Sequence, residues 1–590
     1  MDKKYYTDEK NAQIVLALLK AHGIKKIVAS PGATNIPITG SIQNDPWFQV
    51  VSAPDERSAA YIACGLSAES GETVVLSCTG ATASRNYLPG LTEAYYRKLP
   101  VLAITSMPAF STVGNLVPQS IDRSMQPRDA VKLSVFVPVV KDAADFESNS
   151  LLVNRAILET LHHGGGPVHI NLETSYKGTF NTRELPKVVR ISRITSESVE
   201  WPTLDPRAKV AVFVGAHKPF SQSQAEALEA FVGCHNAVVF CDHTSAYKGA
   251  GRMLGALACS QKLSAKSEYR DLKPDLIIHI GEISGDYPTQ SFLSCGVPVW
   301  RVSEDGEIRD RFKRLECVFE MSESYFFHRY AEETEPRENT YLQDWTGYEE
   351  KLHDGLPELP FSNAWMAQTL APRMPKGSVI HFGILNSLRC WNLFEFDSSI
   401  DAACNVGGFG IDGCVSTLIG ASLADSSRLH FGVVGDLAFF YDLNSLGNRH
   451  VGKNLRILLI NNGGGGEFKL YSHIGSQFEE QTDDFIAAGR HYGNKSPVLA
   501  RHYAEDLGFE YLCANGKDEF DRVVGRFVDP AAQDKPILFE CFTNLQDDSD
   551  ALELLEHLDA SVSTEVAARR LAGKYLPSSV KGIIKKALGK

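Results

Sequence analysis

Residues 433–466 read VVGDLAFFYDLNSLGNRHVGKNLRILLINNGGGG, and this stretch decides the fold class. It holds an apolar strand that ends at Gly435-Asp436, a helix-like segment, and a second apolar strand that ends at Asn461-Asn462. Asn462 follows Asp436 by 26 residues (462 − 436). Neighbouring parallel strands end at the same edge of a sheet, where open α/β sheets bind their ligands. We therefore expect Asp436 and Asn462 to lie close together at that edge.

The polar groups at this edge predict a magnesium site. A carboxylate, an amide oxygen and the backbone carbonyls of a glycine-rich turn are hard oxygen ligands suited to Mg²⁺. The predicted ligands are Asp436, Asn462 and the carbonyl of Gly464. A metal bound there would hold a diphosphate, to which Leu437 and Ala438 would offer backbone N–H groups at a helix start. Four consecutive glycines alone would indicate only a flexible turn.

Strand and helix patterns alternate along the chain in three blocks of similar size. The predicted domains are residues 1–185, 200–345 and 355–550, followed by a helical tail at 551–590 that turns basic at its end. The polar stretch 186–206 is typical of a linker. Short apolar strands that alternate with helices indicate parallel sheets covered on both faces. The predicted fold class is therefore α/β, with three doubly wound parallel-sheet domains.

Composition narrows the function classes. The 590 residues are 43% hydrophobic and 22% charged, which is ordinary for a globular chain, and no apolar run is long enough to span a bilayer. The net charge of −13 argues against a nucleic-acid binder. The first residues, MDKKYYTDEKNAQ, are too polar for a secretory signal, and the 12 cysteines are scattered without a C-x-x-C pair. This pattern favours a reducing compartment, and we expect a cytoplasmic protein.

The order of the motifs resembles that of the thiamine-diphosphate (ThDP) enzymes, whose signature is G-D-G, a gap of somewhat under thirty residues, and N-N. Over nearly the whole chain, the three blocks match the pyrimidine-binding, middle Rossmann-like and diphosphate-binding domains of the decarboxylase branch of that family. The resemblance implies ThDP and Mg²⁺ as cofactors and a homodimer or tetramer with active sites at subunit interfaces. Leu437 stands where the signature has its second glycine. The gap between Asp436 and Asn462 is one residue shorter here than in the family.

Glu56, in the stretch 53–67 (APDERSAAYIACGLS), is the predicted catalytic acid. From the residues alone, Asp55 or Glu56 could simply cap a helix that follows a strand. The resemblance implies that Glu56 contacts N1′ of the aminopyrimidine and promotes the imino form that removes the proton from thiazolium C2. This role needs a carboxyl group that shares a proton with a ring nitrogen in an apolar setting.

Further contacts to the cofactor also rest on the resemblance. Thr79, Gly80 and Asn86 match the family's T-S-G…N element, and Ile411 occupies the position of the apolar residue that supports the bent cofactor. Gln119 matches a glutamine near the reacting carbon, with a polar loop residue as the alternative. The predicted catalytic residues are Glu56 and Gln119, and the predicted cofactor-binding residues are Glu56, Thr79, Gly80, Asn86, Gly410, Ile411, Gly435, Leu437, Ala438 and Gly465.

Several motifs resemble one branch of the family, the SEPHCHC synthases of the menaquinone pathway (MenD), which join decarboxylated 2-oxoglutarate to isochorismate. These motifs are SPGATNIPI, DERSAA, GIDG, GDLAFFYDLNSL and NNGGGGEF. Thr34 and Val406 stand where that branch has arginines that pair with substrate carboxylates, and neither can replace an arginine–carboxylate fork. We therefore expect a different substrate. Arg123, Arg128 and Arg389 are either replacements or solvated surface arginines, and the tentative substrate contacts are Ser30, Thr34, Asn35, Asn115 and Arg389.

The resemblance implies a transferase or lyase. The predicted reaction is decarboxylation of a 2-oxo acid with transfer of the acyl-anion equivalent to a carbonyl or enone acceptor, forming a C–C bond in cell-surface sugar or specialised metabolite biosynthesis. The alternatives are a simple 2-oxo-acid decarboxylase, SEPHCHC synthase itself, and a non-catalytic ThDP-binding relative. A nucleotide-binding dehydrogenase is disfavoured, because VFVGAH at 212–217 lacks the G-x-G-x-x-G fingerprint.

Two features have no place in that reaction. His162-His163 comes just before the strand PVHINLE, where a structural role is favoured over a catalytic pair. At the end of the chain, PSSVKGIIKKALGK places apolar residues on one helical face and lysines around it. We expect that helix to dock on its own dimer, or to contact an anionic membrane surface or a pathway partner.

Overall fold

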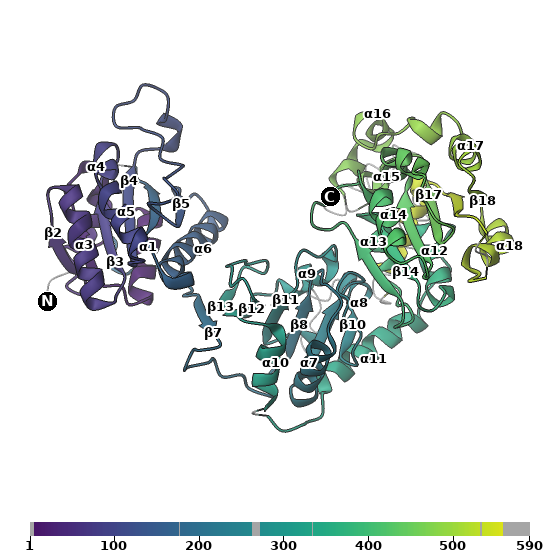
Figure 1. Cartoon of the computed structure of the whole chain (residues 1–590), viewed down its shortest axis with the longest axis horizontal. Coiled ribbons are helices and arrows are strands. Elements are labelled where there is room, and N and C mark those ends of the chain that lie inside the picture. The colour runs from purple at the N-terminus through teal and green to yellow at the C-terminus, as the bar shows by residue number, and fades with distance from the viewer. Residues whose placement is uncertain are drawn as a thin grey trace, which may run out of the picture. The chain divides into compact units, whose positions relative to one another are not determined.

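The computed structural model describes residues 5–175, 178–261, 272–332, 334–471, 473–531 and 534–558. The predicted basic helix of the tail lies outside these residues. The chain has an α/β fold with three sheets of parallel strands, which confirms the predicted fold class (Figure 1). The described residues form two compact units, the first from those up to 199 together with 305–320, and the second from 200–304 together with those from 321 onward.

The first unit is built on a sheet of six parallel strands in the order β2-β1-β3-β4-β6-β5. The strands are β1 (Lys26–Ala29), β2 (Gln49–Ser52), β3 (Val74–Cys78), β4 (Val101–Met107), β5 (Leu133–Val137) and β6 (Val168–Glu173). The helices are α1 (Lys10–Ala21), α2 (Ile36–Ile42), α3 (Glu56–Ser70), α4 (Thr82–Asn86), α5 (Leu88–Tyr96) and α6 (Ala143–Glu159).

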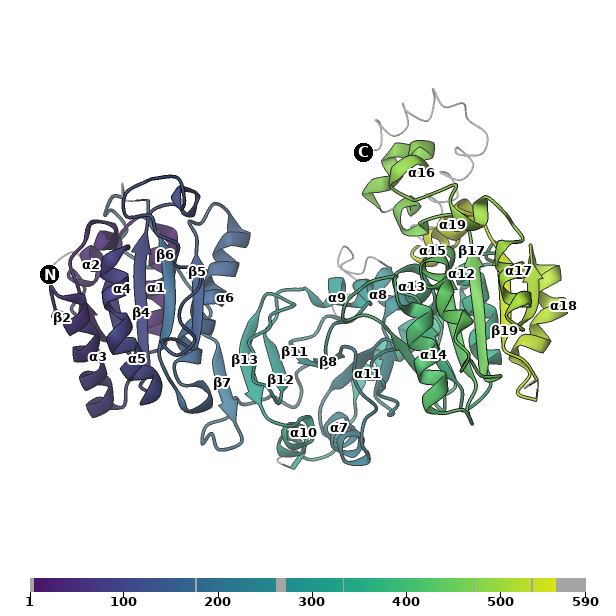
Figure 2. The same ribbon diagram turned by 45° about the horizontal axis from the view of Figure 1, so that its top comes forward.

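Helices cover both faces of this sheet (Figure 2). Successive residues of β1 point to opposite faces, so Ile27 packs among α1, α2 and α6, while Val28 packs among α3 and α5. Small residues let α3 and α5 approach closely, because a Cβ added at Gly90 of α5 would lie 2.4 Å from the Cβ of Ala60 on α3. This packing helps to fix the start of α3, where Glu56 lies.

A short parallel pair, β7 (Ser192–Thr195) and β13 (Leu315–Glu320), also belongs to the first unit. The strand β7 lies inside the stretch 186–206, where the sequence pattern predicts only a linker. Its four residues are too few to carry an alternation signal, and its partner comes from more than a hundred residues further along the chain. The pairing brings residues 305–320, which fall within the predicted middle domain, into the first unit.

The second unit contains two groups of parallel strands. One has the order β10-β9-β8-β11-β12 and the other the order β15-β14-β16-β17-β19-β18, which repeats the strand order of the sheet in the first unit. The first group is β8 (Val210–Val214), β9 (Ala237–Cys241), β10 (Arg252–Leu254), β11 (Leu276–Ile280) and β12 (Val299–Ser303). The second group is β14 (Val379–Phe382), β15 (Asp401–Cys404), β16 (His430–Gly435), β17 (Leu455–Asn461), β18 (Glu510–Ala514) and β19 (Ile537–Phe542).

Helices surround both groups of strands in the second unit. Those near the first group are α7 (Gln222–Cys234), α8 (Ala256–Ser260), α9 (Tyr287–Leu293), α10 (Glu323–Glu332) and α11 (Thr340–Asp354). Those that follow along the chain are α12 (Asn363–Leu370), α13 (Asn386–Trp391), α14 (Cys414–Ala424), α15 (Asp436–Tyr441), α16 (Thr482–Phe485), α17 (Leu499–Asp506), α18 (Lys517–Val528) and α19 (Leu545–Leu555). Residues of α14, α15, β16 and β17 share one buried apolar cluster, which anchors the strand ends that carry Asp436 and Asn462.

Two general properties concern the helices and the cysteines. Within the described ranges, no helix combines the length and the apolar character that crossing a membrane requires. All 12 cysteines are free thiols, as expected for a chain without a disulfide framework.

Candidate functional site

Asp436 lies at the carboxyl end of β16 and meets the glycine turn that follows β17. The two strands pair in parallel, with Gly435 opposite Ile460. One carboxylate oxygen of Asp436 accepts from the N–H of Leu437 at 2.8 Å, and the other accepts from the N–H of Gly463 at 3.0 Å. The strand pattern therefore predicted this juxtaposition correctly.

The surroundings of this carboxylate suit a bound cation. Burial raises the pKa of Asp436 to about 7, even though its two backbone donors oppose the shift. Oδ1 of Asn462 is buried and accepts no hydrogen bond from the residues that the structure describes. A buried amide oxygen without a donor is costly, and a divalent cation held by this oxygen and by Asp436 would satisfy both groups. The donor set therefore fits Mg²⁺.

The two asparagines of the N-N motif have different partners. Nδ2 of Asn461 donates to Oε1 of Glu540 at 2.7 Å, and Oε2 of Glu540 accepts from the hydroxyl of Tyr511 at 2.7 Å. Asn461 therefore ties β17 to β19 and β18 inside the sheet. Nδ2 of Asn462 instead donates to Oδ2 of Asp548 at 2.9 Å. This contact leaves the buried amide oxygen of Asn462 without a donor among the described residues, so it is available to a ligand.

Asp548 on α19 is a positioning residue that sequence reasoning missed. Its Oδ1 accepts from the N–H of Asn363 at 2.9 Å, and its Oδ2 accepts from Thr543 Oγ1 at 3.2 Å as well as from Asn462. This network sets which end of the Asn462 amide faces the metal position. Three aspartates lie close together at 547, 548 and 550, and nothing in their spacing distinguishes the one that turns inward.

We expect the Asp548→Asn substitution to weaken the affinity for Mg²⁺–ThDP by about 10–100-fold. If the new NH₂ group faces Asn462, that amide is driven to flip and to present nitrogen to the metal; in the other orientation the NH₂ group opposes the N–H of Asn363, and the network that holds Asn462 is disrupted. Calorimetric titration of ThDP at fixed Mg²⁺ measures the loss. The matched control is Asp547→Asn, because the half-buried Asp547 side chain accepts only from Asn544 among the described residues. Equal affinities for the two variants would contradict the role of Asp548.

In the first unit, the structure separates the roles of Asp55 and Glu56. Asp55 is the N-cap of α3, where its carboxylate accepts from the N–H groups of Arg57 at 2.9 Å and Ser58 at 3.2 Å. The side chain of Glu56 is half-buried and takes no part in this cap. Burial raises the pKa of the Cys78 thiol to about 12, and the charge of Glu56 contributes to this shift. The Glu56 carboxylate therefore lies near the carboxyl end of β3, and no hydrogen bond to it is found among the described residues.

The residues after β1 and β3 contact each other. The hydroxyl of Thr34 is hydrogen bonded to the hydroxyl of Thr79 and donates to the carbonyl of Ser106 at 3.2 Å. A Cβ at Gly32 would lie 2.5 Å from the Cβ of Thr79, so this approach requires glycine. Thr34 from the tentative substrate set and Thr79 from the predicted cofactor set therefore share one place at the edge of the sheet, beside Gly80.

Two other tentative substrate residues lie inside the unit. The hydroxyl of Ser30 donates to the carbonyl of Ala53 at 2.8 Å, and Oδ1 of Asn35 accepts from the hydroxyl of Ser77 at 2.7 Å. Both side chains are fully buried. They hold neighbouring strand ends together, so the structure gives each of them a local structural task.

The segment after β4 is exposed and has a strained backbone at the predicted catalytic glutamine. Gln119 has a φ of 63° and Leu116 a φ of 57°, a region that residues other than glycine seldom adopt. Asn115 is exposed and donates from Nδ2 to the carbonyl of Ser111 at 2.7 Å. Asn86, at the end of α4, is also exposed. Strain of this kind is common where a loop presents side chains to a ligand.

The remaining predicted cofactor contacts of the second unit have the following surroundings. Ile411 follows Gly410 just before α14 and is half-buried against the apolar cluster beneath it. The carbonyl of Gly464 accepts from the N–H of Gly466 at 3.0 Å, and the N–H of Gly465 donates to the carbonyl of Ala487 at 2.6 Å. Leu437 and Ala438 are the predicted N–H donors to the diphosphate, and both lie on α15. The N–H of Leu437 already donates to Asp436.

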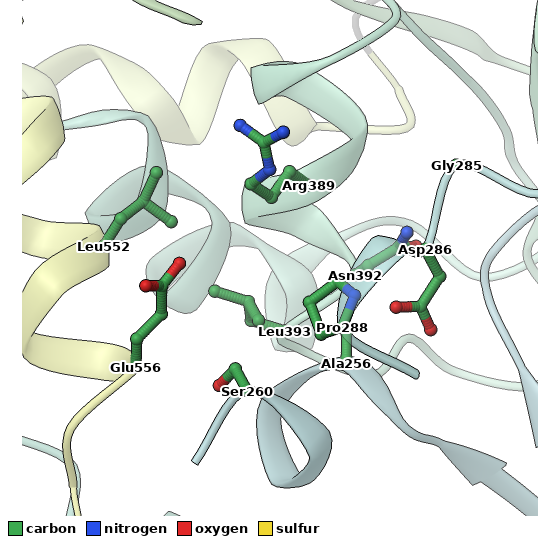
Figure 3. Close-up of a pocket in the computed structure, with 10 residues that line it drawn as sticks. All are labelled: Ala256, Ser260, Gly285, Asp286, Pro288, Arg389, Asn392, Leu393, Leu552 and Glu556. Atoms are coloured by element: carbon green, nitrogen blue, oxygen red, sulfur yellow. The ribbon is translucent and has the colours of Figure 1, made fainter. Parts of the chain in front are cut away.

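Arg128 is exposed, as expected for a solvated surface arginine, whereas Arg123 and Arg389 are held by other side chains. The guanidinium of Arg389 forms a two-pronged pair with Glu467, with N–O distances of 2.5 and 3.0 Å, and also donates to Asn386. Arg123 is buried, donates to Thr105 Oγ1 at 2.9 Å and Asn171 Oδ1 at 2.7 Å, and has its pKa lowered to about 10 by burial. Arg389 also lines a small pocket in the second unit (Figure 3), together with Ala256, Ser260, Gly285, Asp286, Pro288, Asn392, Leu393, Leu552 and Glu556.

Comparison with known proteins gives consistent matches. Residues 9–127 match the family described as "Thiamine pyrophosphate enzyme, N-terminal TPP binding domain". The chain is 31% identical over 568 residues to the 2-succinyl-5-enolpyruvyl-6-hydroxy-3-cyclohexene-1-carboxylate synthase (SEPHCHC synthase) of Bacteroides thetaiotaomicron. The match covers 94% of this chain and 99% of that protein. It is 31% identical over 564 residues to the protein of the same name from Phocaeicola vulgatus, with the same coverage of both chains.

Proposed function

The chain belongs to the thiamine-diphosphate-dependent enzyme family, and from this premise we propose that it decarboxylates a 2-oxo acid and transfers the resulting acyl-anion equivalent to a carbonyl or enone acceptor. The observation that carries this proposal is the buried, unpartnered Oδ1 of Asn462 beside the Asp436 carboxylate, because it marks a place for the cation that anchors a diphosphate. When bound, ThDP would supply a nucleophilic carbon for addition to the 2-oxo group and a thiazolium ring to take up the electron pair left as CO₂ departs.

The residues of the chain have distinct tasks in this reaction. Asp436 and Asn462 hold the metal and so fix the diphosphate, with Asp548 keeping the Asn462 oxygen turned inward. Glu56 shares a proton with the pyrimidine ring, a task for which its carboxylate is available because Asp55 caps the helix. Ile411, on the apolar cluster of the second unit, supports the cofactor from below. Gln119, on an exposed loop, would contact the reacting carbon.

The substrates differ from those of the SEPHCHC synthases. Where that branch has an arginine for a substrate carboxylate, this chain has Val406, which is buried and apolar, and Thr34, which is bound to Thr79. Neither side chain can form an arginine–carboxylate fork. We therefore place the chain among the carboligases of the family with an acceptor of another kind, such as an aldehyde or a nucleotide-linked keto sugar.

Each active site forms between two copies of the chain, as the family architecture implies. The edge strand β2 and the helix α3, which frame Glu56, expose the apolar residues Val50, Val51, Tyr61 and Ile62. A monomer seldom leaves such a patch beside a functional carboxylate uncovered. A second copy would cover it and bring the partner's Asp436 to the cofactor whose pyrimidine ring contacts Glu56.

A screen of 2-oxo acids tests the reaction class. The purified protein is incubated with each acid, with ThDP and Mg²⁺ together or singly, and with or without aldehyde, keto-sugar nucleotide or isochorismate as acceptor, and CO₂ release is followed. We expect release from at least one acid that requires both ThDP and Mg²⁺ and rises with a suitable acceptor. Product formation from 2-oxoglutarate and isochorismate would identify a SEPHCHC synthase instead, and no release from any combination would refute the proposal.

A further inference from the structure

His162 and His163 face one carboxylate in the first unit. They lie in the short helix η3 (His162–Gly164), directly after α6, and their rings stack with centroids 3.6 Å apart. Nε2 of His162 lies 3.2 Å from Oε2 of Glu320, and Nε2 of His163 lies 3.2 Å from Oε1 of the same residue. Glu320 is the last residue of β13. Both oxygens of one carboxylate therefore meet an imidazole nitrogen.

The hydrogen bonding of His162 leaves a lone pair without a donor. Nδ1 of His162 is 2.9 Å from Oε2 of Glu159, whose other oxygen lies 3.1 Å from the ammonium of Lys132. Because the Glu159 carboxylate can only accept, this contact places a proton on Nδ1, so Nε2 is the nitrogen that a neutral ring would offer to a metal ion. Nε2 is buried and, although it lies near Oε2 of Glu320, it makes no well-directed hydrogen bond to the described residues. A metal ion between Nε2 and that carboxylate would satisfy both groups.

The chain is shaped to present the two histidines together. His163 has a φ of 46°, in the left-handed region that costs a residue other than glycine some free energy. Gly164, Gly165 and Gly166 follow with φ values of 84°, 85° and 146°, and complete a turn that returns the chain to β6. A strained histidine ahead of three glycines is a pattern that packing alone does not require.

We propose that Nε2 of His162, Nε2 of His163 and the carboxylate of Glu320 bind a divalent transition-metal ion of the Zn²⁺ class. Two ligands at about 2.1 Å from a tetrahedral ion lie about 3.4 Å apart, close to the two nitrogen–oxygen distances of 3.2 Å. Imidazole nitrogens select such ions over Mg²⁺, which prefers oxygen. Glu159 holds the outer nitrogen of His162, as carboxylates commonly do behind metal-binding histidines.

The charges around the cluster allow an ion to enter. Two cations lie nearby: the Lys132 ammonium pairs with Glu159, and Nε of Arg193 lies 3.5 Å from Oε2 of Glu320, with its Nη atoms held by the carbonyls of Leu158 and Gly306. Oε1 of Glu320 faces His163, whose side chain is 66% exposed, so the ion can arrive from solvent on that side. The bound ion would cross-link the turn after α6 to the end of β13 and so hold residues 305–320 in the first unit.

Titration of the full-length protein with Zn²⁺ and with Co²⁺ tests this site, with ThDP and excess Mg²⁺ present throughout. Calorimetry gives the stoichiometry and affinity of binding, and the visible absorption of Co²⁺ reports tetrahedral nitrogen–oxygen ligation. The melting temperature measures how much the bound ion stabilises the fold. We expect one equivalent to bind to the wild type and to raise the melting temperature. His163→Ala, which removes an exposed side chain, and Glu320→Gln should each weaken binding more than about 100-fold.

Two control variants make the result decisive. His328→Ala removes another exposed histidine, on α10, and should bind the ion as the wild type does. Asp436→Asn should also keep the Zn²⁺ equivalent, because the proposed site is separate from the magnesium position. No binding to the wild type, or unchanged affinity in both His163→Ala and Glu320→Gln, would overturn the proposal.

Discussion

Replacing Glu56 with glutamine is expected to lower kcat by about 10²–10⁴-fold, the range for loss of a general acid–base group. The amide keeps the size of the side chain but cannot exchange a proton with the pyrimidine ring. Because Glu56 takes no part in capping α3, the fold and the affinity for ThDP should stay near those of the wild type. Steady-state assays with the best 2-oxo acid, together with calorimetric titration of ThDP, separate these two effects.

The neighbouring residue provides the matched control for this prediction. Asp55→Asn alters the cap of α3 and should cost at most about 1 kcal/mol of stability while leaving turnover near the wild-type value. If Glu56→Gln and Asp55→Asn lost activity to the same extent, the effect would belong to the helix start and the assigned role of Glu56 would be wrong.

The Asp436→Asn substitution is expected to abolish productive cofactor binding, with an affinity for ThDP in Mg²⁺ more than about 100-fold weaker. The variant loses the negative charge that a divalent cation neutralises, and its amide nitrogen faces one of the two backbone donors that Asp436 accepts from. Raising the Mg²⁺ concentration should recover part of the binding. Calorimetric titration of ThDP at several Mg²⁺ concentrations measures both effects.

Asp425→Asn is the control for the metal position. Its exposed carboxylate lies in the same unit and accepts only from Ser427 among the described residues. That variant should bind the cofactor as the wild type does. An Asp436→Asn protein with an affinity within about threefold of the wild type would remove Asp436 from the metal site.

The contact between Asp436 and the glycine turn was predictable from the sequence because it depends on local patterns. Two apolar strands, the crossover between them and the polar residues at their ends place Asp436 next to the turn that follows Asn462, whatever the rest of the chain does. The different hydrogen-bond partners of Asn461 and Asn462 were not predictable. They are Glu540 in β19 and Asp548 in α19, whose distance from the motif along the chain is about 80 residues.

Burial and long-range pairing account for the other differences. The sequence leaves open whether Asp55 or Glu56 caps α3, and only the backbone geometry at the start of the helix assigns the cap to Asp55. Arg123 looks like a solvated arginine in the sequence, yet it is buried against Thr105 and Asn171 from two different strands. The strand β7 exists because a distant partner completes it, which no local pattern can reveal.

The most direct test of a cofactor shared by two chains is a purified heterodimer of one Glu56→Gln chain and one Asp436→Asn chain, isolated by two different affinity tags. Each parental homodimer lacks an essential group at both sites. If Glu56 of one copy acts with the partner's Asp436, the heterodimer has one intact site and should show about half of the wild-type activity. Activity no higher than that of the two inactive homodimers would contradict the shared site.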